Sequence, residues 1–112
     1  MHLERPPNVL DQNCPSRKAL EIVTAKWSVL AIHAIESGPQ RYNQILARIG
    51  GISPKMLTQV LNELQTRNII TKLPAESGDH VEYSLTSLGR SLTGLLSGLC
   101  KWAEVHQDEI GV

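Results

Sequence analysis

The clearest hydrophobic pattern lies in the segment ISPKMLTQVLNEL, residues 52–64. Its residues Leu57, Val60, Leu61 and Leu64 recur at helical spacing, so they predict one face of a helix that packs on a core. The opposite face lacks the spaced Glu and Lys pairs that are typical of a solvated helix. It carries short or neutral groups that donate and accept hydrogen bonds: Ser53, Lys55, Thr58, Gln59 and Asn62. These groups are suited to contacting another molecule.

Proline and glycine residues divide the rest of the chain into an arm, short helices, a strand pair and a final helix. Pro6, Pro7 and Pro15 keep residues 1–15 out of regular helix, so this segment is expected to be an N-terminal arm. Apolar periodicity, together with the intervening Gly and Pro residues, predicts helices at about 16–23, 26–37, 43–49, 54–67 and from 87 onward.

The third and fourth predicted helices are expected to form a helix-turn-helix. Gly50 and Gly51 end the third helix, because glycine tolerates the backbone of a helix C-terminus. Ser53 is placed to cap the fourth helix, and Pro54 occupies its first position, where the missing N–H costs nothing. The fourth helix stops at Asn68, which tolerates a left-handed cap. Two helices joined by a tight turn that contains glycine are typical of a helix-turn-helix.

A β-hairpin is predicted next. The β-prone segments IITKL, residues 69–73, and VEYSL, residues 81–85, flank PAESGDH, which contains a Ser-Gly turn pair. Thr86 or Ser87 can then cap the final helix. This order of elements predicts a fold that is mainly α with a small β-hairpin: a winged helix-turn-helix with N- and C-terminal dimerisation elements.

The final helix carries a run of leucines and two glycines that indicate a partner. Gly94 and Gly98 each cost about 1 kcal/mol of helix propensity relative to Ala. Close approach of a partner helix would offset that cost, whereas the alternative is packing against the helix's own domain. The predicted dimer interface comprises Leu88, Leu92, Leu95, Gly98, Leu99 and Trp102.

Composition bounds the function. The 112 residues suffice for one domain, and their net charge of zero argues against a nucleic-acid partner, since phosphate contacts need cations. The distribution of charge along the chain outweighs this argument. Residues 41–72 carry five cations and one carboxylate, net plus four, whereas residues 73–112 carry two cations and six carboxylates, net minus four. The middle of the chain is therefore the part suited to DNA.

Several motifs in order resemble one family of bacterial regulators. They are CPSRKAL, KWSVLAI, GPQRYNQIL, GISPKMLTQVLNELQ and VEYSLTSLG, which together span Cys14 to about Trp102. In these motifs the chain resembles the HxlR-type branch of the MarR-like winged helix-turn-helix transcriptional regulators. It departs from the family pattern at Thr24-Ala25, where a Gly pair is common, and at Asn68, where Gly is usual.

The resemblance and the residues together imply contacts with double-stranded DNA. Gln59 and Asn62 can pair with adenine, Lys55 with guanine, and Thr58 can contact a thymine methyl or a phosphate. Arg41 and Arg48 are placed for phosphates. The hairpin tip is acidic, so Lys72 and His80 are its nearest candidates for a phosphate contact. The set of predicted DNA-binding residues is Arg41, Arg48, Ser53, Lys55, Thr58, Gln59, Asn62, Lys72 and His80.

The resemblance also implies a domain organisation and an operator. Residues 1–15 are expected to form the arm, 16–86 the DNA-binding domain and 87–112 the dimerisation helix. A homodimer with twofold symmetry would bind an inverted repeat.

Cys14 and Cys100 are the candidate redox-sensing residues. Cys14 precedes Pro15 at a helix start, where the helix dipole, Arg17 and Lys18 are expected to favour the reactive thiolate. Several HxlR-type regulators respond to oxidants or quinone-like electrophiles through the Cys of this Cys-Pro motif. Cys100 lies in an apolar helical run, where a thiol is commonly buried and inert; the alternative is that it pairs with Cys14 of the other subunit. The alternative is that Cys14 only packs the arm.

Other classes of function find less support. The histidines His2, His33, His80 and His106 lack metal-ligand spacing, so neither a metal nor a cofactor is expected. The sequence offers no nucleophile-base pair or phosphate loop, so an enzyme is not expected. The longest apolar stretch, WSVLAIHAI, is too short to span a bilayer, so a cytoplasmic protein without a membrane partner is expected. The alternative function is a winged helix that binds only proteins, which the neutral total charge and the acidic wing favour.

Overall fold

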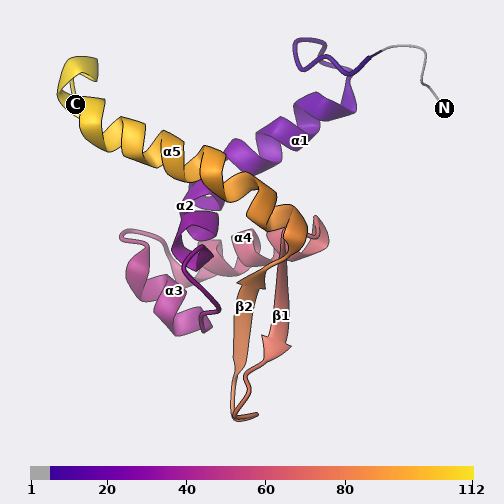
Figure 1. Ribbon diagram of the computed structural model, residues 1–112, viewed down its shortest axis with the longest axis vertical. Helices are drawn as coiled ribbons and strands as arrows, with labels where there is room; N and C mark the ends of the chain where they lie inside the picture. Colours follow the sequence, from indigo (N-terminus) through magenta and orange to yellow (C-terminus); the bar gives the residue numbers. More distant parts are fainter. Residues whose placement is uncertain (1–5) are drawn as a thin grey trace.

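The structure is a computed structural model that describes residues 6–112. Five helices and a two-stranded antiparallel sheet occur among these residues, in the order expected for a winged helix-turn-helix (Figure 1). The elements are α1 (Pro15–Thr24), α2 (Lys26–Ile35), α3 (Tyr42–Arg48), α4 (Pro54–Thr66), β1 (Ile70–Pro74), β2 (Val81–Leu85) and α5 (Ser87–Ile110). Within this part of the chain, no helix has the length and apolar character needed to cross a membrane.

The core lies where α2, α3 and α4 meet. The largest fully buried side chains are Ile32, Ile35, Ile45, Leu57, Leu61 and Leu64. Three of these six residues belong to α4, so the apolar stripe predicted for that helix is confirmed as its buried face.

The capping residues predicted around α4 are confirmed. The Ser53 hydroxyl accepts a hydrogen bond from the Met56 backbone N–H at 3.0 Å, and Pro54 occupies the first helical position. At the other end, Asn68 adopts φ of 63°. The Ile69 N–H then bonds the Leu64 carbonyl at 2.9 Å, which closes the C-terminus of α4. Because Ile69 is used in this closure, β1 begins at Ile70 and not, as expected, at Ile69.

Helix α2 ends at Ile35, two residues before the predicted end at Ser37. The reason is that two side chains from outside the helix donate hydrogen bonds to a carbonyl group near its C-terminus. Both the Gln40 amide and the Arg48 guanidinium donate to the Ala34 carbonyl. The carbonyl is therefore satisfied without a further helical turn.

The β1–β2 hairpin forms the wing and is anchored to the helices at its base. Ile70 pairs with Leu85 and Pro74 with Val81 at the two ends of the ladder. Gln40 forms a bridge to Tyr83 through two backbone hydrogen bonds of 3.0 and 2.7 Å. The wing is thus fixed to the loop between α2 and α3.

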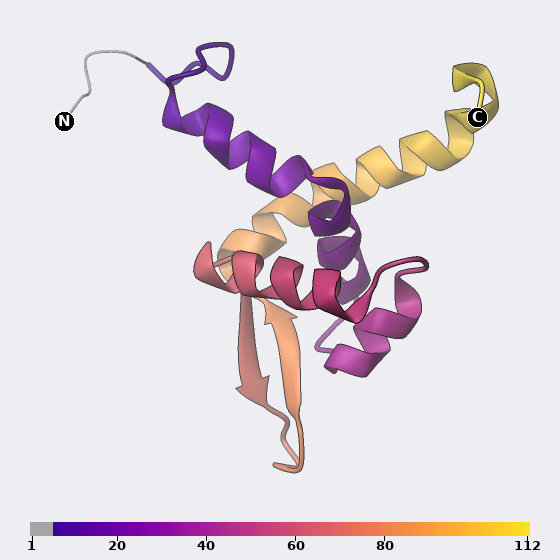
Figure 2. The ribbon, with the colours of Figure 1, turned by 180° about the vertical axis from the view of Figure 1, so that it is seen from behind.

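Helices α1 and α5 cross, and the N-terminal end of α1 and the C-terminal end of α5 diverge from the winged-helix body on the side away from the wing (Figures 1 and 2). Thr86 caps α5 by accepting a hydrogen bond from the Gly89 N–H at 3.0 Å. A side chain at Gly89 would meet the Ile69 carbonyl, so glycine allows the start of α5 to lie against the segment between α4 and β1.

Candidate nucleic-acid interface

The outer face of α4 is polar and largely without partners. Lys55, Thr58, Gln59 and Asn62 are all exposed, on the side opposite the core. Among residues 6–112, the side chains of Lys55, Gln59 and Asn62 make no hydrogen bond or ion pair. These three groups are therefore available to another molecule without first breaking a contact.

Thr58 differs because its hydroxyl contacts Tyr42 of α3. The Tyr42 hydroxyl lies 2.8 Å from the Pro54 carbonyl and 3.2 Å from the Thr58 hydroxyl. The sequence pattern did not identify Tyr42 as part of the interface, since no local signal relates it to residues 12 and 16 positions away. Only the packing of α3 on α4 brings them together.

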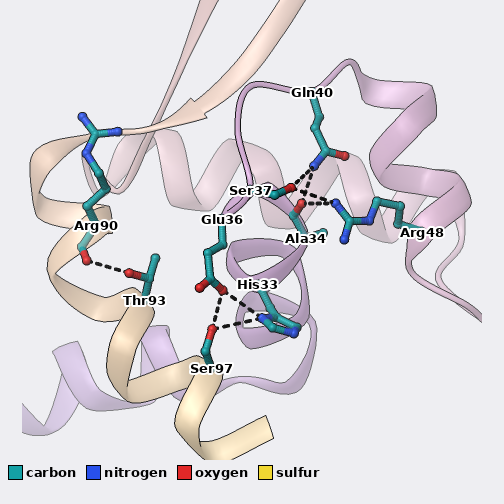
Figure 3. A network of polar contacts seen from close by, with 9 residues as sticks. All are labelled: His33, Ala34, Glu36, Ser37, Gln40, Arg48, Arg90, Thr93 and Ser97. Carbon is teal, nitrogen blue, oxygen red and sulfur yellow. Dashed lines mark hydrogen bonds and ion pairs between the residues drawn. The ribbon is translucent and has the colours of Figure 1, made fainter. Parts of the chain in front are cut away.

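The two arginines predicted to contact phosphates have different surroundings. One nitrogen of the Arg48 guanidinium donates to the Ala34 carbonyl at 2.7 Å and to the Ser37 hydroxyl at 3.3 Å (Figure 3). Arg48 is thus partly used in holding α3 to the end of α2. Arg41 is exposed at the N-terminus of α3, and its charge acts on His80 of the wing. Of the two guanidinium groups, that of Arg48 is therefore the more engaged in contacts within the fold.

The wing tip carries a compact set of hydrogen-bonded charges. The two ring nitrogens of His80 lie 2.7 Å from an Asp79 oxygen and 3.1 Å from a Glu82 oxygen. Both nitrogens donate only in the imidazolium, so hydrogen bonds to Glu82 and then Asp79 raise the pKa of His80 above its ordinary value. The pKa of Asp79 is lowered by the Ser77 hydroxyl and by His80. His80, predicted to contact phosphate, is therefore already paired with carboxylates.

Lys72 is the other predicted wing contact. It is exposed on β1, with its ammonium 5.8 Å from the ring centroid of Tyr83. This distance is within the range of a cation–π contact, which leaves the ammonium accessible to a phosphate.

A cluster of three polar side chains, His33, Glu36 and Ser97, joins α5 to the C-terminal end of α2. His33 Nδ1 lies 3.0 Å from a Glu36 oxygen and 3.2 Å from the Ser97 hydroxyl, which itself donates to Glu36 (Figure 3). The Ser97 hydroxyl, followed by His33, lowers the pKa of the Glu36 carboxyl. Within the described part of the chain, no group of His, Cys, Asp and Glu could hold a metal ion. His2, considered as a ligand in the sequence, lies outside the described residues.

Cys14 is the N-cap residue of α1, and its sulfur is hydrogen-bonded. Its Sγ lies 3.0 Å from the Ser16 hydroxyl and accepts from the Asn8 N–H at 3.3 Å. These contacts, with Ser16 first, lower the pKa of the Cys14 thiol. The sequence predicted a favoured thiolate from Arg17, Lys18 and the helix dipole, whereas the main causes in the structure are the contacts with Ser16 and Asn8. The Arg17 guanidinium donates to the carbonyls of Val9 and Leu10.

Helix α5 presents an apolar face that no other part of residues 6–112 covers. Leu95 is 74% exposed and Trp102 50% exposed, and a Cβ added at Gly98 would meet no atom within 4 Å. Leu88 and Leu99 are likewise exposed, whereas Leu92 and Cys100 are partly buried against the core. An apolar groove of about 610 Å³ adjoins this face, lined by residues that include Val9, Ala19, Leu20, Ile22, Leu88 and Leu92.

The comparisons with known proteins agree with this geometry. A model of the HxlR-like helix-turn-helix family matches residues 22–110. The chain belongs to that family. It is 36% identical over 104 residues to the HTH-type transcriptional regulator YtfH of Escherichia coli (strain K12), covering 92% of this chain and 82% of YtfH. The resemblance seen in the sequence is therefore confirmed.

Solved structures of other transcriptional regulators have the same fold. The transcriptional regulator ytfH from Salmonella typhimurium superposes with a TM-score of 0.83 at 33% identity, covering 94% of this chain and 95% of that chain. The redox regulator HypR in its reduced form gives a TM-score of 0.75 at 28% identity, covering 86% and 96%. This HxlR-like chain is accordingly a transcriptional regulator of the helix-turn-helix type, and these relatives are described as regulators, not enzymes.

Proposed function

We propose that this chain is a homodimeric transcriptional regulator that binds a specific double-stranded DNA operator through the outer face of α4. The observation that carries the proposal is the set of exposed, unengaged polar side chains on that face. Solvated helices commonly use such positions for paired charges, whereas base edges require free donors and acceptors. The helix spans 13 residues, or about 20 Å, so its N-terminal half can enter a major groove about 12 Å wide.

Each side chain on the outer face of α4 has a base edge that fits it. The amides of Gln59 and Asn62 can each donate to and accept from adenine, and Lys55 can donate to guanine. Ser53, at the helix N-cap, would lie near the phosphate backbone in this arrangement, and the exposed cations of Arg41 and Lys72 are proposed to contact phosphates. Base specificity is thus assigned to α4, and phosphate contacts to its neighbours.

Salt dependence tests this function. Binding to random duplex DNA should weaken steeply as salt rises, because protein cations displace counterions from phosphates. The alternative function, a winged helix that contacts only proteins, is favoured by the carboxylates of the wing tip. A protein-interaction module would show little binding to the duplex at any salt concentration, which would contradict the proposal.

The proposed dimer interface comprises α5, α1 and the N-terminal arm. The uncovered face of α5 is continuous with the apolar groove beside α1, and a second copy of the chain has the matching apolar surface. The open space at Gly98 leaves room for close approach of a partner helix. A C2 dimer would place two α4 helices at half-sites about one DNA turn, roughly 34 Å, apart, so the operator should be an inverted repeat.

Light scattering tests the dimer. The wild type is expected to be dimeric at micromolar concentration, and Leu95→Glu or Gly98→Leu should produce monomer. Gln107→Glu is a matched control, because Gln107 is exposed near the end of the same helix. A wild type that is monomeric, or a Leu95→Glu variant that remains dimeric, would remove this assignment.

Cys14 is proposed as a sensor of oxidants or electrophiles. Its lowered pKa favours the thiolate, and a solved relative, HypR, is described as a redox regulator. The end of α1 that holds Cys14 points away from α5 (Figures 1 and 2), so Cys100 of the other subunit is the proposed resolving thiol. With diamide, the two thiols lose two protons and two electrons to form the disulfide, and diamide becomes the hydrazine.

Oxidation in solution tests the sensor. Diamide or a quinone should change operator affinity in the wild type, and Cys14→Ser should not respond. A non-reducing gel should show a covalent dimer that Cys100→Ser removes. If wild type and Cys14→Ser respond equally, Cys14 only packs the arm.

A further inference from the structure

We propose that Tyr42 sets the base preference of α4 by fixing the Thr58 hydroxyl as a hydrogen-bond acceptor toward DNA. The inference rests on the proposed function and deepens it, because it assigns a specificity-determining role to a residue outside the DNA-facing surface. Tyr42 is the first residue of α3, and its ring is partly buried against the core while its hydroxyl reaches the first turn of α4.

The directions of two hydrogen bonds follow from the atoms involved. The Tyr42 hydroxyl lies 2.8 Å from the Pro54 carbonyl oxygen, which has no hydrogen to give, so the phenol donates. The phenol hydroxyl has a single hydrogen to donate, and that hydrogen is engaged by the Pro54 carbonyl. The 3.2 Å contact between Tyr42 and Thr58 is therefore made by the Thr58 hydroxyl donating to the phenol oxygen.

This arrangement replaces the local bond that a threonine in a helix usually makes. Its hydroxyl can donate to the carbonyl four residues earlier, which for Thr58 is the Pro54 carbonyl. The Tyr42 hydroxyl donates to that carbonyl and also contacts the Thr58 hydroxyl. The orientation of Thr58 consequently depends on a side chain from another helix.

The consequence is chemical selectivity at the base that Thr58 faces. With its hydrogen directed at Tyr42, the exposed Thr58 offers DNA only oxygen lone pairs and a methyl group. Adenine and cytosine present amino donors in the major groove, and thymine presents a methyl group, so these bases fit. Guanine presents two acceptors, O6 and N7, and is disfavoured. Without the phenol, the Thr58 hydroxyl can either donate to the Pro54 carbonyl or turn its hydrogen toward guanine, so the discrimination against guanine is weaker.

The experiment is selection from a pool of randomised duplex DNA, followed by affinity measurements on the selected duplex and its single-base-pair variants. Wild type should disfavour guanine at one position of each half-site. Tyr42→Phe, which keeps the ring, should reduce that discrimination by roughly two- to tenfold, the scale of one neutral hydrogen bond, with the other positions unchanged. Tyr83→Phe removes the hydroxyl of the chain's other tyrosine and is the matched control.

Two variants of Thr58 keep the test decisive if Tyr42→Phe destabilises the fold. Thr58→Ser keeps the hydroxyl and should still disfavour guanine, while losing preference for thymine. Thr58→Val keeps the methyl group and should lose preference for adenine and cytosine at the same position. A uniform loss of affinity in Tyr42→Phe, or an unchanged preference in both Tyr42→Phe and Thr58→Val, would overturn the inference. A wild type that selects no sequence would instead overturn the proposed function, and this inference with it.

Discussion

The outer face of α4 and the tip of the wing differ in how far their polar groups are already used. On α4, the side chains of Lys55, Gln59 and Asn62 make no hydrogen bond or ion pair with other described residues, so binding DNA would break no polar contact. On the wing, His80 is held between Asp79 and Glu82, whose carboxylates repel phosphate. A polar side chain that lies on a DNA-facing element of a winged helix is therefore not always free to bind DNA. We expect sequence specificity to come from α4, and the wing tip to contribute little to the affinity for DNA.

Substitutions on the two faces of α4 should differ most in their effect on the stability of the fold. Leu61→Ala removes a side chain that is 1% exposed, so it should lower the free energy of unfolding by about 2–5 kcal/mol. The matched change on the adjacent residue, Asn62→Ala, should change it by less than about 0.5 kcal/mol, because Asn62 is exposed. Urea denaturation followed by circular dichroism measures both. A large loss in Asn62→Ala would mean that the outer face serves stability.

A smaller effect is expected on DNA affinity when the negative charge of the wing tip is reversed. Glu76→Lys replaces an exposed carboxylate at the wing tip by a cation. Affinity for random duplex DNA should rise several-fold at low salt, and the salt slope should increase by up to about 1 if a phosphate contact forms. Glu104→Lys makes the same change of charge on α5 and is the control. Equal effects of the two substitutions would indicate only a change of net charge, and the wing would then not approach DNA.

Much of the fold follows from local signals, whereas the state of the site's polar groups does not. Ser53 and Asn68 act as caps through their own and adjacent residues, so the sequence alone predicts them. The Arg48 bond to Ala34 spans 14 residues and depends on how α3 packs on α2. The sequence shows that His80 can carry a positive charge near the wing tip, but it does not show that the ring is bound to Asp79 and Glu82. Spacing predicts which face a residue occupies, but tertiary packing decides whether its polar atoms are free.

The weakest of these effects should be a pH dependence of the wing. The pKa of His80 is raised by Glu82 and Asp79, so the imidazolium and its stabilising contacts are fully present below the unfolded pKa, about 6.5. As pH rises through the folded pKa, the cation is lost, the wing becomes more negative, and both its stability and its affinity for DNA should fall. Fluorescence anisotropy with duplex DNA across this range should show a modest decrease, of less than about tenfold. The decrease should be absent in His80→Gln; a decrease of the same size in that variant would assign it to another group.

Base recognition by α4 is tested most directly by the affinity of Gln59→Ala for the selected duplex and for random duplex DNA. Gln59 is exposed on α4, so its loss should leave the fold intact. The expected cost is about 1–3 kcal/mol on the selected duplex, with binding to random duplex unchanged, because base contacts specify sequence and phosphate contacts do not. Lys72→Ala on the wing should weaken both slightly and equally. If Gln59→Ala and Lys55→Ala both bind the selected duplex as the wild type does, α4 does not contact the bases.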